Sequence, residues 1–485
     1  MKKYGLIIVG AGSGGLSAAA GAACLGLKVL LVEKNKLGGD CLWNGCIPSK
    51  TLLHEAEKML ILKQEMLIDS GVAIDFAKHY EEAKTRIKQV ENEIAKTDSV
   101  ERFEGLGVDV VFGEAKFYSK NKIVVGDKYF KFKKCIVASG SRPRIPEMFS
   151  AIKFVTNEQF FDLPTLPKTL TVVGGGSIGV EMASAMAMFG TKVRMILKEE
   201  FVMAKEEEVT RKFMTEKLKS LGIEIYPNAN IKKVFEFDGE KCVELENDII
   251  LKSEVVLVAI GREFNTILDL ENAGIELNEN KSIKVNGELQ TTNKRVYAIG
   301  DCNGKMLFTH AAGYQAKAVL NNLFVPKFLK LFGLYRKFTK GAVPTAFPWV
   351  TYTSPEVAHV GKYTADLDRE NISYKVYTTK LEHVDRAKAG GKEEEGFIQV
   401  LIGKRGVFKS GGKILGVTIV APHAGELITE WVLAIENNLP VEAIFNTVHA
   451  YPTLSELNPR GTFEYMSEKL TPFKTQLLKV LFRYF

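Results

Sequence analysis

Two copies of one glycine pattern constrain the fold of this 485-residue chain more than any other feature. In the first copy, an apolar run over residues 4–9 leads into Gly10-Ala-Gly-Ser-Gly-Gly15, and an alanine-rich helix is predicted to about Leu25. A strand over residues 28–32 follows and ends at Glu33, 18 residues after the last glycine of the pattern. In such a βαβ unit the glycines permit a tight turn, the helix N-terminus faces a pyrophosphate, and the carboxylate accepts hydrogen bonds from a ribose. The pattern therefore predicts a dinucleotide site.

The second copy has the same parts in the same order. A strand over residues 170–173 precedes Gly174-Gly-Gly-Ser-Ile-Gly179, a helix is predicted to about Phe189, and a further strand covers residues 192–197. The chain is therefore expected to hold two dinucleotide sites in an α/β fold.

A pair of cysteines lies between the two copies, in the stretch Gly38-Gly-Asp-Cys-Leu-Trp-Asn-Gly-Cys-Ile-Pro-Ser-Lys50. Cys41 and Cys46 are separated by four residues, and Lys50 follows four positions after the second cysteine. Two thiols at this spacing can close as a disulfide and open again as a dithiol. Such a pair needs an electron source, which the two dinucleotide sites can supply.

The other cysteines and the charge indicate the cellular setting. The remaining four are scattered, at Cys24, Cys135, Cys242 and Cys302, so the chain lacks the disulfide framework of a secreted protein and fits a reducing compartment. The basic N-terminus leads straight into the first strand and is not interpreted as a signal peptide. The sequence contains no apolar stretch of about 18 residues, so no membrane-spanning helix is predicted. A net charge of +7 gives no case for nucleic acid as a partner. A cytoplasmic enzyme is expected.

The rest of the chain divides into further segments. Charged helices are predicted over residues 52–64 and 76–103, followed by short strands between 108 and 137 and a glycine turn at 138–143. From residue 341 onward the pattern changes to strands at 396–402 and 413–420 and a helix at 425–437, which predicts a third, α+β domain.

By these motifs the chain, from Tyr4 to about Met466, resembles the pyridine nucleotide–disulfide oxidoreductases, such as lipoamide dehydrogenase, glutathione reductase and mercuric reductase. The resemblance rests on Gly-Gly-x-Cys-x4-Cys-Ile-Pro-Ser-Lys, both glycine repeats, Ile299-Gly-Asp301, and Tyr451-Pro-Thr-Leu-Ser-Glu456. It implies two Rossmann-like domains and a C-terminal domain that forms a homodimer. The implied boundaries are 1–150 with 280–340 for FAD, 151–279 for NAD(P), 341–469 for the interface, and 470–485 for a basic amphipathic tail.

The resemblance also implies roles for individual residues. Cys46 is the thiol nearest the flavin ring, Cys41 is the interchange thiol that meets the substrate, and Lys50 pairs with Glu181 beside the flavin. In the dimer, Tyr451 and Glu456 reach the disulfide of the other subunit. Residues implied for FAD are Gly10, Gly12, Gly15, Glu33, Gly39, Cys41, Ser139, Gly140, Asp301, Thr309, His310 and Ala311. Gly174, Gly176 and Gly179 are implied for the nicotinamide dinucleotide, and Gly14, Lys34, Asp40, Lys50, Ala115, Lys198 and Gly261 complete the cofactor-binding set. No metal site is implied.

One departure concerns the proton transfer that accompanies thiol–disulfide interchange. Position 451 is a histidine in lipoamide dehydrogenases and glutathione reductases, and histidine suits proton transfer because its pKa lies near working pH. Tyr451, with an ordinary pKa near about 10, does not suit it. His449 lies two positions earlier and is interpreted as structural, the alternative being a substitute base. In lacking that histidine the chain most resembles the mercuric reductase-like branch, but no cysteine pair follows Cys302.

The nicotinamide preference stays open between NADPH and NADH. Lys198, 19 residues after Gly179, can meet a 2′-phosphate and favours NADPH. Glu199, Glu200 and the glycine at position 179 favour NADH.

Two segments are both basic and apolar, 324–340 and 470–485. In the second, Pro472 is predicted to open a helix with apolar side chains on one face and Lys479 opposite. This pattern is typical of a helix that lies in a membrane interface. The alternative is that both segments pack on the protein.

The sequence thus predicts an FAD-dependent enzyme that passes hydride from NAD(P)H to the Cys41–Cys46 disulfide and on to a small-molecule or protein acceptor. Two alternatives remain. One is a quinone or metal-ion (Hg²⁺-like) reductase, peripheral at the inner face of the membrane, and the other is a flavin redox sensor or scaffold with little turnover.

Overall fold

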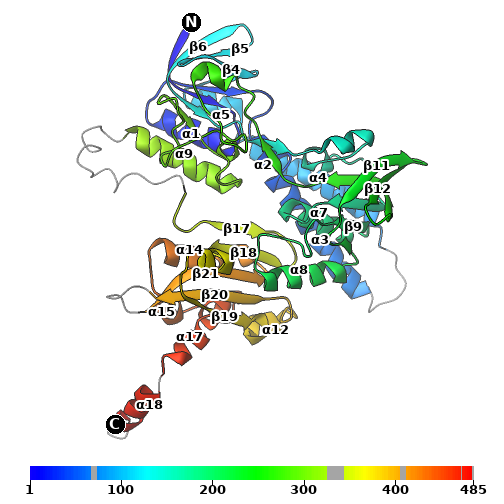
Figure 1. The fold of residues 1–485 in the computed structure, drawn as a ribbon, viewed down its shortest axis with the longest axis vertical. Coiled ribbons are helices and arrows are strands. Elements are labelled where there is room, and N and C mark those ends of the chain that lie inside the picture. The colour runs from blue at the N-terminus through cyan, green and yellow to red at the C-terminus, as the bar shows by residue number, and fades with distance from the viewer. Residues whose placement is uncertain (67–73, 325–342, 405–410, 471, 483–485) are drawn as a thin grey trace. The chain divides into compact units, whose positions relative to one another are not determined.

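The computed structural model describes residues 1–66, 74–324, 343–404, 411–470 and 472–482. The chain forms two compact units (Figure 1). Unit 1 comprises Met1–Ala204 and Thr215–Val343, and unit 2 comprises Lys205–Met214 and Pro344–Phe485. Most of the segment 324–340 lies outside the described residues.

The first sheet of unit 1 contains the first glycine repeat. Its strand order is β3-β2-β1-β6-β5-β4, with β16 beside β6, and β3, β2, β1, β6 and β16 run parallel. In β1, Ile7 and Val9 enter one hydrophobic core while Leu6 and Ile8 enter another. Burial on both faces explains the continuous apolar run in the sequence. The strands are β1 (Lys2–Val9), β2 (Val29–Glu33), β3 (Val108–Phe112), β4 (Ala115–Ser119), β5 (Lys122–Val125), β6 (Lys128–Val137) and β16 (Val296–Ala298).

The second repeat lies in a four-stranded parallel sheet of order β10-β9-β8-β14. Its strands are β8 (Thr169–Val173), β9 (Lys192–Ile196), β10 (Glu224–Tyr226) and β14 (Val255–Val258). Two smaller antiparallel sheets complete the strands of unit 1, namely β11 (Ile231–Phe237), β12 (Glu240–Leu245) and β13 (Ile250–Ser253), and β7 (Ser141–Pro143) with β15 (Arg262–Phe264).

Helices α1 and α9 pack against each other beside the first sheet, and α3 packs against α4 and α7 (Figure 1). The helices up to residue 324 are α1 (Ser13–Cys24), α2 (Gly39–Trp43), α3 (Cys46–Met66), α4 (Phe76–Ala95), α5 (Val100–Gly105), α6 (Asn157–Phe160), α7 (Ser177–Met188), α8 (Glu208–Ser220) and α9 (Thr309–Phe324).

The single helix expected over residues 76–103 is wrong, because the structure divides it into α4 and α5. The Ser99 hydroxyl accepts a hydrogen bond from the backbone N–H of Arg102 and caps the second helix. Serine competes for backbone groups in this way and favours a cap over a helix interior. The helix expected over 425–437 is likewise divided into two.

Unit 2 is built on an antiparallel sheet of order β17-β18-β21-β20-β19. Its core includes Trp431, fully buried among apolar residues of the sheet and the following helices. The strands are β17 (Pro348–Thr351), β18 (Glu356–Gly361), β19 (Tyr374–Lys380), β20 (Phe397–Lys404) and β21 (Gly412–Ala421). The helices are α11 (Thr364–Arg369), α12 (Asp385–Ala389), α13 (Ala424–Leu427), α14 (Thr429–Glu436), α15 (Val441–Asn446), α16 (Leu457–Arg460), α17 (Phe463–Glu468) and α18 (Pro472–Leu481).

The C-terminal helix and the absence of a membrane-spanning helix are both expected from the sequence. The helix expected from Pro472 is confirmed as α18. None of the helices in the described ranges is both long and apolar enough to cross a membrane.

Candidate redox-active site

The cysteine segment is held against the first glycine turn. The backbone N–H of Gly38 donates to the carbonyl of Ala11 at 2.9 Å, and Gly38 has a positive φ of 98°. A Cβ atom on Gly39 would lie 2.7 Å from the Cα of Gly12, so only glycine allows this approach. The segment that carries the thiols therefore sits directly on the loop predicted to bind a dinucleotide.

The two thiols lie on consecutive short elements, Cys41 within α2 and Cys46 at the first position of α3. Both are partly buried, the two thiols influence each other's ionisation, and Cys46 Sγ lies 3.2 Å from Thr309 Oγ1. The hydrogen bond from Cys41, the Thr309 hydroxyl and the Lys50 charge lower the pKa of Cys46 to about 6. The same pairing and burial raise the pKa of Cys41. A thiolate is thus favoured on Cys46, where the N-terminus of a helix also stabilises negative charge.

Lys50 links the cysteine helix to the second repeat. Its Nζ lies 2.8 Å from Glu181 Oε2, and Glu181 is buried in α7, the helix that follows the second glycine turn. The cysteine segment therefore contacts both repeats, through Gly39 at the first and through Lys50 at the second.

The first glycine turn has the backbone features of a pyrophosphate site. Gly10 has a φ of 102°, and a Cβ there would lie 2.3 Å from the carbonyl oxygen of Ala138. Helix α1 begins after Gly12 with no side-chain cap and no acidic residue in its first turn. Glu33 accepts hydrogen bonds from the backbone N–H groups of Ala11 and Asn35 at 2.7 and 2.8 Å. Each carboxylate oxygen keeps a further lone pair, so these residues fit an adenosine ribose and pyrophosphate.

The second turn repeats this geometry. Gly174 has a φ of 113°, and a Cβ there would lie 2.4 Å from the carbonyl oxygen of Ala259. A Cβ on Gly176 would meet no atom within 4 Å, whereas Gly12 faces the cysteine segment. Helix α7 also begins without a side-chain cap. These residues fit a second dinucleotide.

A polar network beside the cysteines involves residues that the sequence did not indicate. Arg262 contacts Asp40 Oδ2 at 3.0 Å and donates through Nε to Ser141 Oγ at 2.6 Å. Ser141 donates to Asp301 Oδ2, and burial raises the pKa of that carboxyl. Arg262 therefore ties the residue before Cys41 to Asp301. The sequence offered one sign of this network, namely that a basic residue, Arg262, directly follows the glycine turn at Gly261.

A second contact that the sequence did not predict holds the turn after β6. Ser139 Oγ donates to the carbonyl of Asn265 at 2.6 Å, and Asn265 Nδ2 donates to the carbonyl of Ser139 at 2.9 Å. The loop after β15 thus fixes the Ser139-Gly140 turn.

The remaining predicted cofactor residues differ in their surroundings. Gly14 faces helix α9, where a Cβ would lie 3.1 Å from Ala312 Cβ. Ala115 and Ala311 are buried. His310 is exposed with its ring near that of Phe308, and Lys34 and Lys198 are exposed beyond the ends of β2 and β9.

In unit 2, Tyr451 and Glu456 do not bond to each other. Tyr451 is 71% exposed and its hydroxyl donates to Asp385 at 3.3 Å, which raises the pKa of the phenol. Glu456 instead accepts from Arg460 at 2.5 Å. The carboxylate therefore does not orient the side chain at position 451.

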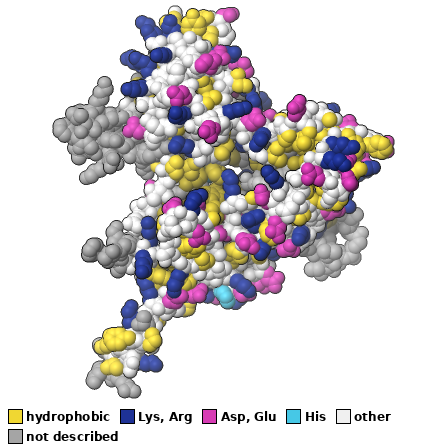
Figure 2. All heavy atoms as spheres, viewed as in Figure 1, with side chains coloured by type: hydrophobic (Ala, Val, Ile, Leu, Met, Phe, Trp, Pro, Cys, Tyr) yellow, Lys and Arg dark blue, Asp and Glu magenta, His cyan; other side chains and the backbone are white. Residues whose placement is uncertain are grey.

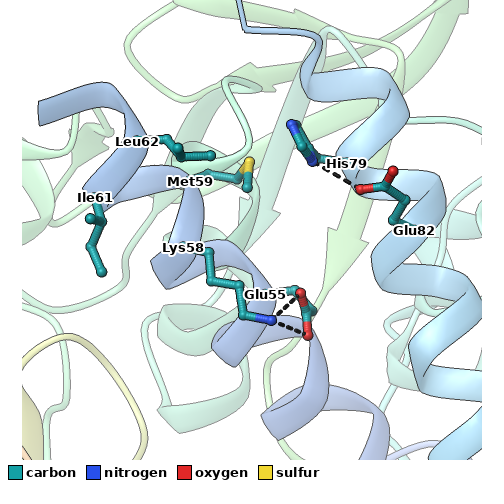
Figure 3. A pocket seen from close by; sticks show the side chains of 7 residues that line it. All are labelled: Glu55, Lys58, Met59, Ile61, Leu62, His79 and Glu82. Atoms are coloured by element: carbon teal, nitrogen blue, oxygen red, sulfur yellow. Dashed lines mark hydrogen bonds and ion pairs between the residues drawn. The ribbon is translucent and has the colours of Figure 1, made fainter. Parts of the chain in front are cut away.

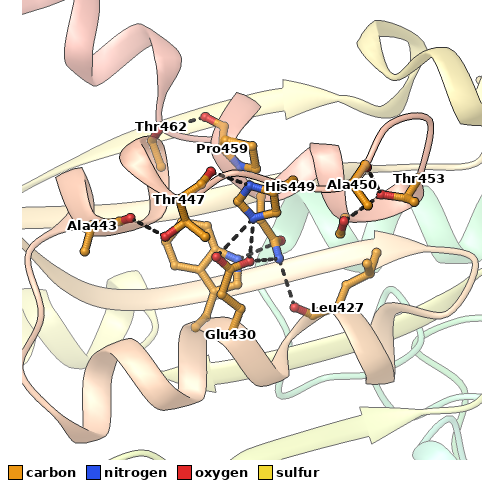
Figure 4. Close-up of polar contacts among 12 residues, drawn as sticks. Leu427, Glu430, Ala443, Thr447, His449, Ala450, Thr453, Pro459 and Thr462 are labelled. Carbon is orange, nitrogen blue, oxygen red and sulfur yellow. Dashed lines mark hydrogen bonds and ion pairs between the residues drawn. The ribbon is translucent and has the colours of Figure 1, made fainter.

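His449 is held at both ring nitrogens (Figure 4). Nδ1 lies 2.8 Å from the carbonyl of Thr447 and Nε2 lies 3.0 Å from Glu430, which also accepts from Asn458 at 2.7 Å. Both ring nitrogens face hydrogen-bond acceptors within unit 2, so neither is directed at an external substrate.

A groove between α3 and α4 lies further along the cysteine helix (Figure 3). Its polar contacts are Lys58 to Glu55 at 2.7 Å and His79 to Glu82 at 3.0 Å. No predicted site residue lines it. Within the described part of the chain, no three metal-ligating side chains converge as a metal site.

Comparisons with known proteins agree with this geometry. The family model described as pyridine nucleotide-disulphide oxidoreductase matches residues 4–316, and the model of its dimerisation domain matches residues 347–459. Dihydrolipoyl dehydrogenase from Geobacillus stearothermophilus is 33% identical over 465 residues, covering 93% of this chain and 94% of the relative. The enzyme of the same name from Mycoplasma genitalium is 32% identical over 478 residues, covering 96% of this chain and all of the relative.

Solved structures share the fold. The HOCl-induced flavoprotein disulfide reductase RclA from Escherichia coli superposes with a TM-score of 0.82 at 23% identity, over 94% of this chain and 99% of that chain. LpdA from Mycobacterium tuberculosis gives a TM-score of 0.80 at 22% identity, over 96% of this chain and all of that chain. The α/β architecture predicted from the sequence is thereby confirmed. The chain belongs to the pyridine nucleotide-disulphide oxidoreductases, a family of enzymes that use FAD and a pyridine nucleotide.

Proposed function

We propose that this enzyme takes electrons from NAD(P)H, reduces its Cys41–Cys46 disulfide and passes the electron pair to an external acceptor. The observation that carries the proposal is the convergence of both thiols, Thr309 and the Lys50–Glu181 pair at the start of α3, on a segment that contacts both glycine repeats.

The cofactor assignment follows the two turns. We assign residues 1–150 and 280–340 to FAD and residues 151–279 to the nicotinamide dinucleotide. When bound, FAD supplies hydride acceptance from the nicotinamide and electron-pair delivery to the disulfide. Gly10, Gly12, Gly15 and Glu33 would hold its adenosine half, and Gly174, Gly176 and Gly179 would hold the second dinucleotide.

The thiol step balances as an interchange. Two electrons break the Cys41–Cys46 bond and leave a thiolate on Cys46, stabilised by Thr309 and Lys50. Cys41, once deprotonated, attacks a disulfide acceptor, forms a mixed disulfide and expels one thiolate. Cys46 then attacks the sulfur of Cys41, which releases the second thiol and restores the pair. NAD(P)H and one proton from water supply the two hydrogens of the product thiols.

The surroundings of position 451 favour an acceptor that needs no base from this loop. Asp385 keeps Tyr451 a neutral phenol, Glu456 is paired with Arg460, and His449 is bonded at both nitrogens. Slow interchange with lipoamide or glutathione disulfide is therefore expected, although relatives at 32–33% identity are named dihydrolipoyl dehydrogenase. We also propose a cytoplasmic homodimer, in which Tyr451 and Glu456 approach the partner's disulfide.

The second candidate is direct transfer from flavin to a quinone or a metal ion. The same loop favours it, since neither acceptor requires a base at position 451. One RclA structure is described as a Cu(II) complex, which adds copper to Hg²⁺ as an ion to test.

One experiment separates the candidates. The FAD-loaded enzyme is reduced anaerobically with NADPH or NADH and then mixed with lipoamide, glutathione disulfide, a soluble quinone, Hg²⁺ or Cu²⁺. Cys41→Ser is compared with Cys24→Ser, an exposed cysteine outside the pair. Loss of turnover in Cys41→Ser alone indicates dithiol chemistry, and survival indicates direct flavin oxidation. Failure of both nucleotides to reduce the enzyme contradicts the proposal and favours a sensor or scaffold.

A further inference from the structure

Helix α18 presents an apolar face that no described part of the protein buries. Its ten residues include no buried side chain. Its large apolar side chains, together with Phe482 directly after the helix, have exposed fractions between 42% for Leu478 and 77% for Phe473. Figure 2 shows apolar side chains gathered at the C-terminal helix with basic side chains beside them. Isolated exposed leucines are common on proteins, but a group on one short helix marks an interaction site.

The spacing aligns the apolar side chains. Phe473, Leu477, Val480 and Leu481 follow the i, i+4, i+7, i+8 pattern of one helix face. Lys479 lies two positions after Leu477 and so projects from the opposite side of the helix.

The charge of the tail indicates which kind of partner α18 can bind. After Glu468 the sequence contains no acidic residue, whereas Lys474 and Lys479 are both exposed on α18. Two such tails from two copies of the chain would repel each other. A surface of anionic lipid complements both the basic and the apolar side chains.

We infer that α18 docks the enzyme on the anionic surface of a lipid bilayer, with Phe473, Leu477 and Leu481 inserted between headgroups. A single ten-residue helix binds weakly, but a homodimer carries two copies, and the second binds at a high effective concentration. The inference does not depend on which acceptor the enzyme reduces.

The test is co-sedimentation of the full FAD-loaded chain with vesicles of phosphatidylcholine, with and without phosphatidylglycerol. Binding is expected only with phosphatidylglycerol and only at low salt. Leu477→Glu with Leu481→Glu, or Lys474→Gln with Lys479→Gln, is expected to weaken binding on the order of tenfold or more. Phe237→Glu is the matched control, because Phe237 is 60% exposed at the end of β11.

Each other outcome contradicts the inference. No sedimentation with anionic vesicles at low salt overturns it, as does unchanged binding after deletion of residues 470–485. If Leu477→Glu instead shifts the monomer–dimer equilibrium in sedimentation velocity, a second copy covers the helix. Turnover with a soluble acceptor is measured in every variant and is expected to be unchanged, which separates this inference from the proposed function.

Discussion

The hydroxyl oxygen of Thr309 lies 3.2 Å from the sulfur of Cys46, although 263 positions separate the two residues in the chain. Thr309 opens α9 and Cys46 opens α3, so two helix N-termini meet at one thiol. The reduced site is thereby built to hold negative charge on Cys46.

Thr309→Val is expected to raise the pKa of Cys46, because valine has a similar shape and cannot donate a hydrogen bond to the thiolate. Alkylation by iodoacetamide is followed against pH in the reduced Cys41→Ser protein and read at Cys46 by mass spectrometry, because the exposed Cys24 also reacts. Relative to Cys41→Ser with Thr309 intact, the rate at pH 6 is expected to fall roughly fivefold and the pH midpoint is expected to rise, because the Thr309 hydroxyl lowers the pKa of Cys46. Thr309→Ser keeps the hydroxyl and is expected to retain the original profile. An unchanged profile in Thr309→Val would show that the hydroxyl does not stabilise the thiolate.

Lys50→Met removes a cation 2.8 Å from the buried carboxylate of Glu181. The free energy of unfolding is expected to fall by about 1–3 kcal/mol, because a buried charge loses a charge-assisted hydrogen bond. Denaturant unfolding measures this, and Lys50→Met with Glu181→Gln is expected to recover part of the loss. Lys58→Met is the control on the same helix, since its pair with Glu55 is half exposed and worth less. Equal losses in the two single variants would argue against a special role for the Lys50 pair.

Gly176→Ala is expected to weaken NAD(P)H binding about tenfold while leaving FAD content unchanged. A Cβ at this position meets open space in the protein but projects toward an approaching pyrophosphate. Nucleotide titration and the flavin absorbance of the purified protein measure the two effects. Gly105→Ala, also in open space and at the end of α5, is the control. Loss of flavin with normal nucleotide binding would assign the two repeats in the opposite order.

His449→Ala is expected to destabilise the protein by about 1–3 kcal/mol, because it leaves hydrogen-bond acceptors of a partly buried network unpaired. Turnover with a disulfide acceptor is expected to persist. Thermal unfolding and steady-state rates measure both, with the exposed His383→Ala as the control. Full stability combined with a large loss of turnover would instead make His449 the proton donor.

The sequence predicted the parts of the site whose chemistry is local. Both glycine turns and the cysteine stretch follow from residues within about 20 positions of one another, because a βαβ unit and a first helical turn are short-range structures. The contact of Lys50 with Glu181 came from the family resemblance, and no pattern around either residue predicts it.

Other features depend on tertiary packing. Arg262 in β15 joins Asp40 of α2 to Ser141 of β7 and to Asp301, four elements far apart in the sequence, so no spacing predicts that network. The break between α4 and α5 depends on the capping hydrogen bond of Ser99, which the periodicity of apolar residues does not reveal. The pairing of His449 with Glu430, and not with Glu456, likewise follows from the packing of unit 2.

The central claim is that electrons from NAD(P)H reach the Cys41–Cys46 pair. The most direct test is anaerobic differential alkylation of the FAD-loaded protein, read by mass spectrometry before and after addition of NADPH or NADH. Labels on Cys41 and Cys46 are expected to appear only after the nucleotide is added, while labelling of Cys24 stays constant. Flavin reduction without new labels on either cysteine of the pair would contradict the account.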